Sequence, residues 1–110
     1  MNITEESVNK VEIICLKGRL DAYNSNLLEN KFNELIDSGK LNMVVDLAGV
    51  DYISSSGLRV MLSSLKKLNK LGGNLKLSSL QPYVQEVFEI AGFTQLFAIY
   101  DKKEEAMASF

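Results

Sequence analysis

Three consecutive serines, Ser54, Ser55 and Ser56, are the residues of this sequence best placed to do chemistry. They stand between an apolar segment predicted to be a strand and an amphipathic segment predicted to be a helix. A hydroxyl at the start of a helix lies next to backbone N–H groups that have no partner inside the helix. These N–H groups, with the positive end of the helix dipole, favour a phosphate that is bound or covalently attached.

The composition excludes several other kinds of site. The 110 residues include no histidine, so a histidine-based catalytic triad and a histidine-rich metal site are both excluded. The single cysteine, Cys15, can form no disulfide within the chain, and its apolar neighbours predict a buried thiol. The net charge of −2, without a basic cluster, argues against nucleic acid or a membrane surface as the main partner.

The length predicts one domain over residues 1–110, with a core that needs neither disulfides nor metal. No segment approaches the roughly 18 consecutive apolar residues of a membrane span. Glu5 and Glu6 stand where a signal peptide would be basic and then apolar. We therefore expect a cytoplasmic protein.

Strands and helices alternate along the chain, which predicts an α/β fold with right-handed crossovers. The expected sheet has four to five strands and is covered by about four helices. Strands are expected at residues 3–8, 11–17, 41–47, 74–78 and 96–100. Helices are expected from a cap at Asp21 to Ser38-Gly39, from the serines to Leu71, from Pro82 to Gly92, and over residues 102–110.

The helix after the serines has one apolar and one polar face, as expected for a helix packed on a sheet. Gly72-Gly73 ends it, and lysines in its last turns suit the negative end of the helix dipole. The apolar face, which we assign to the core, consists of Leu58, Met61, Leu62, Leu65, Leu68 and Leu71; the polar face includes Arg59, Ser63, Lys66, Lys67 and Lys70.

Four motifs in this order resemble the anti-sigma factor antagonist family, whose fold is the STAS domain, and the likeness covers nearly the whole chain. They are a Gly-x-Leu-Asp turn at Gly18 to Asp21, Asp-Leu at Asp46-Leu47, Ser-Ser-x-Gly-Leu at Ser54 to Leu58, and Gly-Phe at Gly92-Phe93. Any one of them alone would be a weak signal.

The resemblance implies a binding module controlled by phosphorylation and no enzymatic activity, cofactor or metal. In this family the unphosphorylated form binds an anti-sigma factor that is also a serine kinase, and a sigma factor is released. The kinase phosphorylates a serine at the head of the second helix, and a PP2C-type phosphatase reverses this partner switching. By motif position the phosphoserine is Ser55. Many members have Asp where this chain has Ser54, so Ser54 and Ser56 are the fallback acceptors.

The predicted partner-binding residues surround this serine. Asp21 is expected to cap a helix at the same sheet edge, where it could hydrogen-bond the serine or help to position the kinase's Mg-ATP. Gly57 is expected to allow close approach of a partner backbone or of the phosphate. The full predicted set is Asp21, Ser54, Ser56, Gly57 and Arg59.

Two further patterns are weighed and set aside. Ser63 and Lys66 have the Ser-x-x-Lys spacing of penicillin-recognising enzymes, but the partner motifs of those enzymes are absent. Asp46 resembles the phosphoacceptor of response-regulator receivers, but no acidic pair for Mg²⁺ accompanies it. We expect Asp46 to stabilise a turn or to orient the serine turn.

Two functions compete with the leading hypothesis of a regulator of transcription. The first is a STAS scaffold or transporter-associated subunit without a sigma-factor partner, which would not need a phosphoacceptor turn. The second is a small-molecule or nucleotide-binding domain that uses the helix N-terminus. It lacks both a P-loop and a Gly-x-Gly-x-x-Gly motif, so it ranks last.

Overall fold

The five strands form one mixed sheet in the order β1-β2-β3-β4-β5. In the computed structural model, which describes residues 1–110, β1 is antiparallel to β2 and all other neighbours are parallel. The strands are β1 (Asn2–Val8), β2 (Val11–Leu20), β3 (Asn42–Ile53), β4 (Asn74–Ser78) and β5 (Ile99–Tyr100); the helices are α1 (Ala22–Asp37), α2 (Ser55–Lys70), α3 (Pro82–Ile90) and α4 (Lys103–Ala108). The predicted α/β fold with a mixed sheet of up to five strands and four helices is confirmed.

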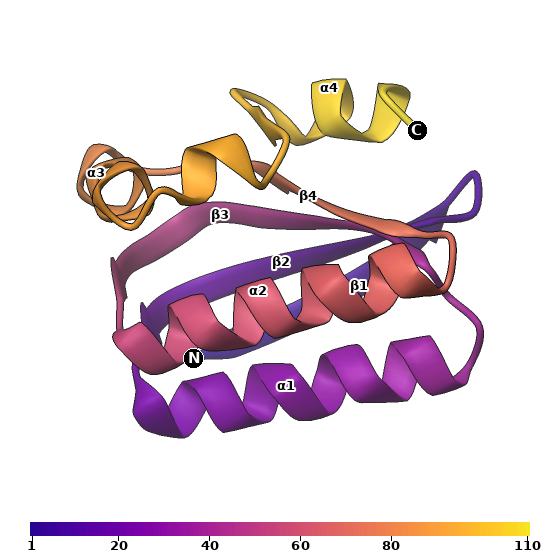
Figure 1. Ribbon diagram of the computed structural model, residues 1–110, viewed down its shortest axis with the longest axis horizontal. Coiled ribbons are helices and arrows are strands. Elements are labelled where there is room, and N and C mark those ends of the chain that lie inside the picture. The colour runs from indigo at the N-terminus through magenta and orange to yellow at the C-terminus, as the bar shows by residue number, and fades with distance from the viewer.

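The helices cover both faces of the sheet (Figure 1). α1 and α2 lie side by side on one face, and α3 and α4 lie on the other. α1 and α2 begin at the same end of the sheet, because each follows a parallel strand. This arrangement brings the starts of the two helices together at one edge.

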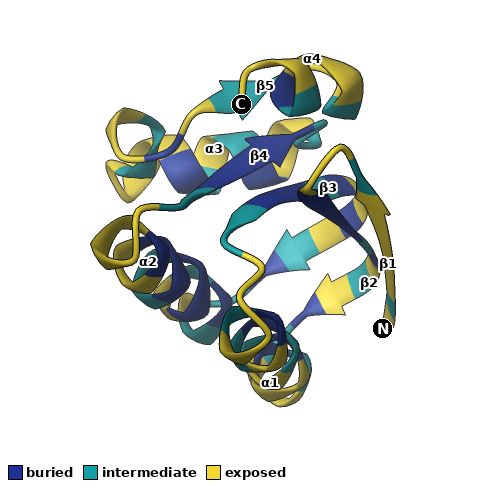
Figure 2. Ribbon diagram, turned by 90° about the vertical axis from the view of Figure 1, so that its right-hand side faces the viewer, coloured by how far each residue is buried: buried dark blue, intermediate teal, exposed yellow.

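Apolar side chains between the sheet and α1 and α2 form most of the core. Figure 2 shows the buried residues on the sides of these helices that face the strands. From α2 the core takes Val60, Met61, Leu65 and Leu68, and from β3 it takes Met43, Val45, Leu47, Val50 and Ile53. The predicted core positions Met61, Leu65 and Leu68 are confirmed, and Leu58 packs on the core while half-buried. Leu62 is half-buried outside the core, and Leu71 is exposed because the helix stops at Lys70.

β3 is longer than predicted, because two β-bulges carry it past the expected end at Leu47. The pairing with β2 shifts once between Cys15 and Lys17 and again between Gly18 and Arg19. The Oδ1 atom of Asp46 accepts a hydrogen bond of 3.0 Å from the Ala48 N–H. A bulge bends a strand and increases its twist. The extra residues therefore lead β3 to the serine turn in a curved path.

β2 also continues beyond its predicted end at Gly18. Gly18 has a backbone φ of +114°, a value that residues with a side chain rarely adopt. It nevertheless pairs with Val50 within the sheet. The glycine therefore marks an irregular position inside the strand rather than its end. The consequence is that Arg19 and Leu20 belong to β2 and lie beside the end of β3.

The last predicted strand, residues 96–100, is wrong over most of its length. A 3₁₀ turn occupies Phe93–Gln95, and only Ile99 and Tyr100 pair with β4. The cause is aromatic packing: the rings of Phe93 and Phe97 each lie 6.0 Å from the ring of Phe88. Phe97 is buried with these rings, and the strand begins only two residues later, at Ile99.

Candidate functional site

The three serines have different structural roles. Ser54 is the N-cap of α2, and its Oγ atom accepts a hydrogen bond of 3.1 Å from the Gly57 N–H. Ser55 is the first residue of the helix and is exposed, whereas Ser56 is half-buried. The N–H groups of the first helical residues have no acceptor inside the helix. An exposed hydroxyl and the positive end of the 16-residue helix α2 therefore meet at Ser55.

The serine turn is joined directly to the turn between β2 and α1. The Ser54 N–H donates a hydrogen bond of 2.9 Å to the carbonyl of Leu20. Asp21, the next residue, caps α1, and its Oδ1 atom accepts a hydrogen bond of 2.9 Å from the Asn24 N–H. The predicted cap and the shared sheet edge are confirmed. The carboxylate of Asp21 is used for this cap and makes no hydrogen bond to a serine.

Gly57 was predicted to let a partner or a phosphate approach closely, but the structure shows that it leaves room for side chains of the core. It is buried, and a Cβ atom placed on it would lie 2.9 Å from Cγ1 of Ile53 and 3.0 Å from Cγ of Leu20. The glycine thus lets the first turn of α2 pack closely on the ends of β2 and β3. The interpretation that its surface invites a partner backbone or a phosphate is corrected, because this surface faces the core.

Two arginines carry positive charge near the serine turn. The Nη1 atom of Arg59 lies 3.8 Å from the Oε2 atom of Glu29, so this ion pair connects α2 with α1. Arg19 lies with its guanidinium carbon 4.1 Å above the ring of Tyr52. Arg59 was predicted from the polar face of its helix, whereas Glu29 was missed. Its position in the middle of α1 indicated only an exposed polar residue.

Asp46 lies away from the serine turn. Besides Ala48, it contacts Cys15, whose Sγ atom lies 3.8 Å from Oδ2. Partial burial of Cys15 and the nearby Asp46 carboxylate raise the pKa of the thiol above its ordinary value. The expectation for Asp46 is corrected: no turn forms at this position, and its hydrogen bond to the Ala48 N–H lies at the bulge within β3. No hydrogen bond joins Asp46 to the serines. Cys15 is only half-buried, which corrects the prediction of a buried thiol.

The Ser-x-x-Lys spacing at Ser63 and Lys66 does not form a catalytic site. The Oγ atom of Ser63 donates a hydrogen bond of 3.2 Å to the Val60 carbonyl of its own helix, and Lys66 is exposed. No group of three or more His, Cys, Asp or Glu side chains is arranged to hold a metal ion. The helices are all too short or too polar to cross a membrane.

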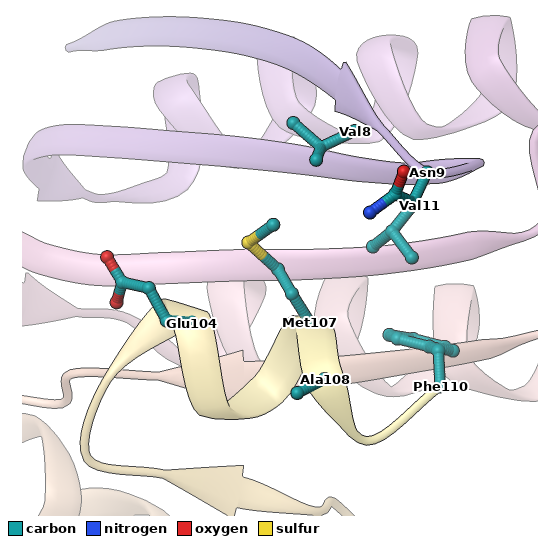
Figure 3. Close-up of a pocket in the computed structure, with 7 residues that line it drawn as sticks. All are labelled: Val8, Asn9, Val11, Glu104, Met107, Ala108 and Phe110. Carbon is teal, nitrogen blue, oxygen red and sulfur yellow. The ribbon is translucent and has the colours of Figure 1, made fainter.

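The hollows of the surface lie elsewhere. A groove of about 390 Å³ runs between the β1–β2 hairpin and α4 (Figure 3). Val8 and Val11 line it from the hairpin, and Met107 and Phe110 line it from the C-terminal segment. None of the predicted site residues lines this groove or either of the two other hollows. The serine turn is therefore an open surface, which suits contact with a macromolecule better than with a small molecule.

Comparisons with known proteins agree with this arrangement. A model of the STAS domain matches residues 2–106. BtrV of Bordetella bronchiseptica, named as a candidate anti-sigma factor antagonist, is 40% identical over 110 residues, which cover 100% of this chain and 95% of BtrV.

Solved structures share the fold. A candidate anti-sigma factor antagonist from Thermotoga maritima superposes with a TM-score of 0.93 at 27% identity, covering 97% of this chain and 92% of that one. The Bacillus anti-sigma factor antagonist SpoIIAA matches at 22% identity, with TM-scores of 0.78 unphosphorylated and 0.79 phosphorylated; 98% of this chain is covered in both cases, and 96% and 98% of SpoIIAA. The family match and the identity to BtrV show that this chain belongs to the STAS domain family and, within it, to the anti-sigma factor antagonists.

Proposed function

We propose that this protein binds an anti-sigma factor when Ser55 is unphosphorylated and releases it when Ser55 carries a phosphate. The partner is an anti-sigma factor that is also a serine kinase, and a PP2C-type phosphatase restores the binding form. The protein is then a kinase substrate and a binding module rather than an enzyme. The observation that carries this proposal is the exposed hydroxyl of Ser55 at the first position of α2.

Ser55 is favoured over its neighbours by their hydrogen bonds and burial. The Oγ atom of Ser54 accepts the Gly57 N–H, so a phosphate there would remove the cap of the helix. Ser56 is half-buried and gives a kinase less room. Ser55 is exposed and has no comparable bond, so a kinase can reach its hydroxyl without breaking the helix start.

The fold should tolerate the phosphate. Phosphorylation adds a charge of about −1.5 to −2 at pH 7, and the helix N-terminus favours a negative charge by roughly 0.3–1 kcal/mol. The phosphorylated and unphosphorylated forms of SpoIIAA resemble this chain equally in fold, with TM-scores of 0.79 and 0.78. This supports a switch that acts on the binding surface and leaves the domain unchanged.

A partner packed over the serine turn would not tolerate a phosphate on Ser55. The complex would have to desolvate a bulky dianion and place it against groups that fit a neutral hydroxyl. Asp21, Ser54, Ser56 and Arg59 surround Ser55 on the proposed contact surface, and Gly57 supports it from inside by holding α2 close to the sheet. A loss of roughly 3–4 kcal/mol would lower the affinity for the anti-sigma factor by about 10²–10³-fold.

The first test is the intact mass, with peptide mapping, after incubation with ATP and serine kinases of the anti-sigma class. One added phosphate on Ser55 is expected. Ser55→Ala should bind the anti-sigma factor and resist the kinase, and Ser55→Asp should bind weakly. Ser56→Ala is the matched control and should still gain the phosphate.

Three outcomes would change the proposal. A phosphate on Ser54 or Ser56 would correct the residue and overturn the assignment to Ser55. Equal binding of the anti-sigma factor by Ser55→Ala and Ser55→Asp would remove the switch. A folded protein that gains no phosphate and binds no anti-sigma factor would favour the scaffold or transporter-associated alternative.

A further inference from the structure

Arg59 lies one helical turn after Ser55 on α2. Side chains four residues apart on a helix are neighbours, with Cβ atoms about 5–6 Å apart. Long side chains on a helix tend to lean toward its N-terminus, so a conformation of Arg59 that reaches the first turn of α2 is accessible. The side chain is 61% exposed and can change its conformation without disturbing the core.

The present partner of Arg59 holds it weakly. The ion pair with Glu29 spans 3.8 Å, near the limit for such a contact, and the Glu29 side chain is 33% exposed. Exposed ion pairs of this kind contribute little to stability, because water and salt screen both charges. An anion with more charge, within hydrogen-bonding distance of the Arg59 guanidinium, can therefore replace Glu29 as its partner.

We propose that a phosphate on Ser55 binds the guanidinium of Arg59 and displaces it from Glu29. This inference rests on the proposed function, because it assumes that Ser55 is the residue that carries the phosphate. A phosphate has up to two charges and three acceptor oxygens, and the planar guanidinium can donate two parallel hydrogen bonds to it. Arg59 is thus the phosphate-binding residue of the switched-off form.

The exchange has a consequence on the neighbouring helix. When Arg59 turns to the phosphate, the Glu29 carboxylate on α1 loses its cation. The surface then changes at two places: a dianion appears at the start of α2, and an uncompensated carboxylate appears on α1. An anti-sigma factor that contacts both helices would meet both changes. This spreads the effect of one phosphate over a wider area than the serine turn.

Other charged groups at this edge are less suited to the phosphate. Arg19 is held over the Tyr52 ring at 4.1 Å, and Lys66 lies seven residues beyond Arg59, two further turns along α2. Asp21 on the α1 cap and Asp51 near the end of β3 carry negative charge and would raise the pKa of the phosphate. The helix N-terminus lowers this pKa as well, so a cation is recognised by the change in pKa when its side chain is removed, with Arg59 and Arg19 as the two candidates to separate.

The test uses the full chain with phosphoserine installed at position 55 by genetic code expansion, which needs no kinase. A ³¹P NMR titration measures the second pKa of the phosphate, which is ordinarily about 6. In Arg59→Gln this pKa should rise by a few tenths of a pH unit relative to the otherwise wild-type phosphoprotein. Arg19→Gln is the matched control and should leave it unchanged. The ¹³C shift of the Glu29 carboxylate should also respond to phosphorylation, and only when Arg59 is present.

An unchanged phosphate titration in Arg59→Gln would overturn the inference, and a rise in Arg19→Gln instead would assign the contact to Arg19. Neither result touches the kinase reaction, which the mass measurement tests separately. Conversely, an installed phosphate that pairs with Arg59 in a protein that no kinase modifies would refute the proposed function and leave the contact standing.

Discussion

The Ser54 N–H donates a hydrogen bond of 2.9 Å to the carbonyl of Leu20, and this bond joins the start of α2 to the end of β2. Leu20 and Ile53 pair in the sheet immediately before their respective helices begin. The caps of α1 and α2, Asp21 and Ser54, each follow one residue later. The turn that carries Ser55 is therefore held by strand pairing on one side and by a helix cap on the other.

Loss of the cap at Ser54 should weaken the domain. Ser54→Ala removes the acceptor of the Gly57 N–H, and loss of an N-cap costs about 1 kcal/mol. Urea unfolding followed by circular dichroism should show a lower midpoint with an unchanged slope. Ser56→Ala, on the same turn but without a cap bond, should stay within about 0.5 kcal/mol of wild type. Equal midpoints for the two variants would show that the Ser54 bond is not stabilising.

Gly57→Ala should reverse the usual effect of this substitution in a helix. Alanine ordinarily stabilises a helix by about 1 kcal/mol relative to glycine. Here the new methyl group would meet Ile53 at 2.9 Å and Leu20 at 3.0 Å, and overpacking of this kind costs about 1–3 kcal/mol. Thermal unfolding should show a lower Tm, and Gly57→Ser, with one more atom, should be worse. A Tm above that of wild type would mean that the packing at this point is loose.

The thiol of Cys15 should react slowly with alkylating reagents at neutral pH. Burial and the Asp46 carboxylate raise its pKa, and only the thiolate is nucleophilic. The rate of reaction with iodoacetamide should therefore rise at higher pH than for an ordinary thiol. Asp46→Asn should move the profile to lower pH, because it removes the nearby negative charge. A profile that is identical in both proteins would exclude Asp46 as a cause.

The same shift predicts a pH dependence of stability. A pKa that is raised in the folded state means that the unfolded chain loses this proton first as the pH increases. The stability from the neutral thiol is thus complete below the ordinary thiol pKa and is lost as the pH rises through the raised value. Cys15→Ser should show a smaller loss of stability over this alkaline range.

The sequence by itself determined which segments become helices and strands near the site. Asp21 was predicted as a cap because its short side chain accepts a hydrogen bond from a free N–H group, and the run of serines placed the start of α2 without deciding which serine caps it. The apolar spacing after Ser54 likewise predicted the buried face of α2, including Met61 and Leu65. These are local properties, because capping and periodicity depend on neighbours within a few residues.

Tertiary structure decided the lengths of β3 and β5 and the contacts of Gly57 and Arg59. The bulges that extend β3 arise from its pairing with β2, and the short β5 results from packing of Phe93 and Phe97 on Phe88. The inward direction of Gly57 and the contact between Arg59 and Glu29 require two elements to meet in space. Such contacts join residues far apart in the chain, and only the docking of α1 and α2 side by side on the sheet brings them within reach.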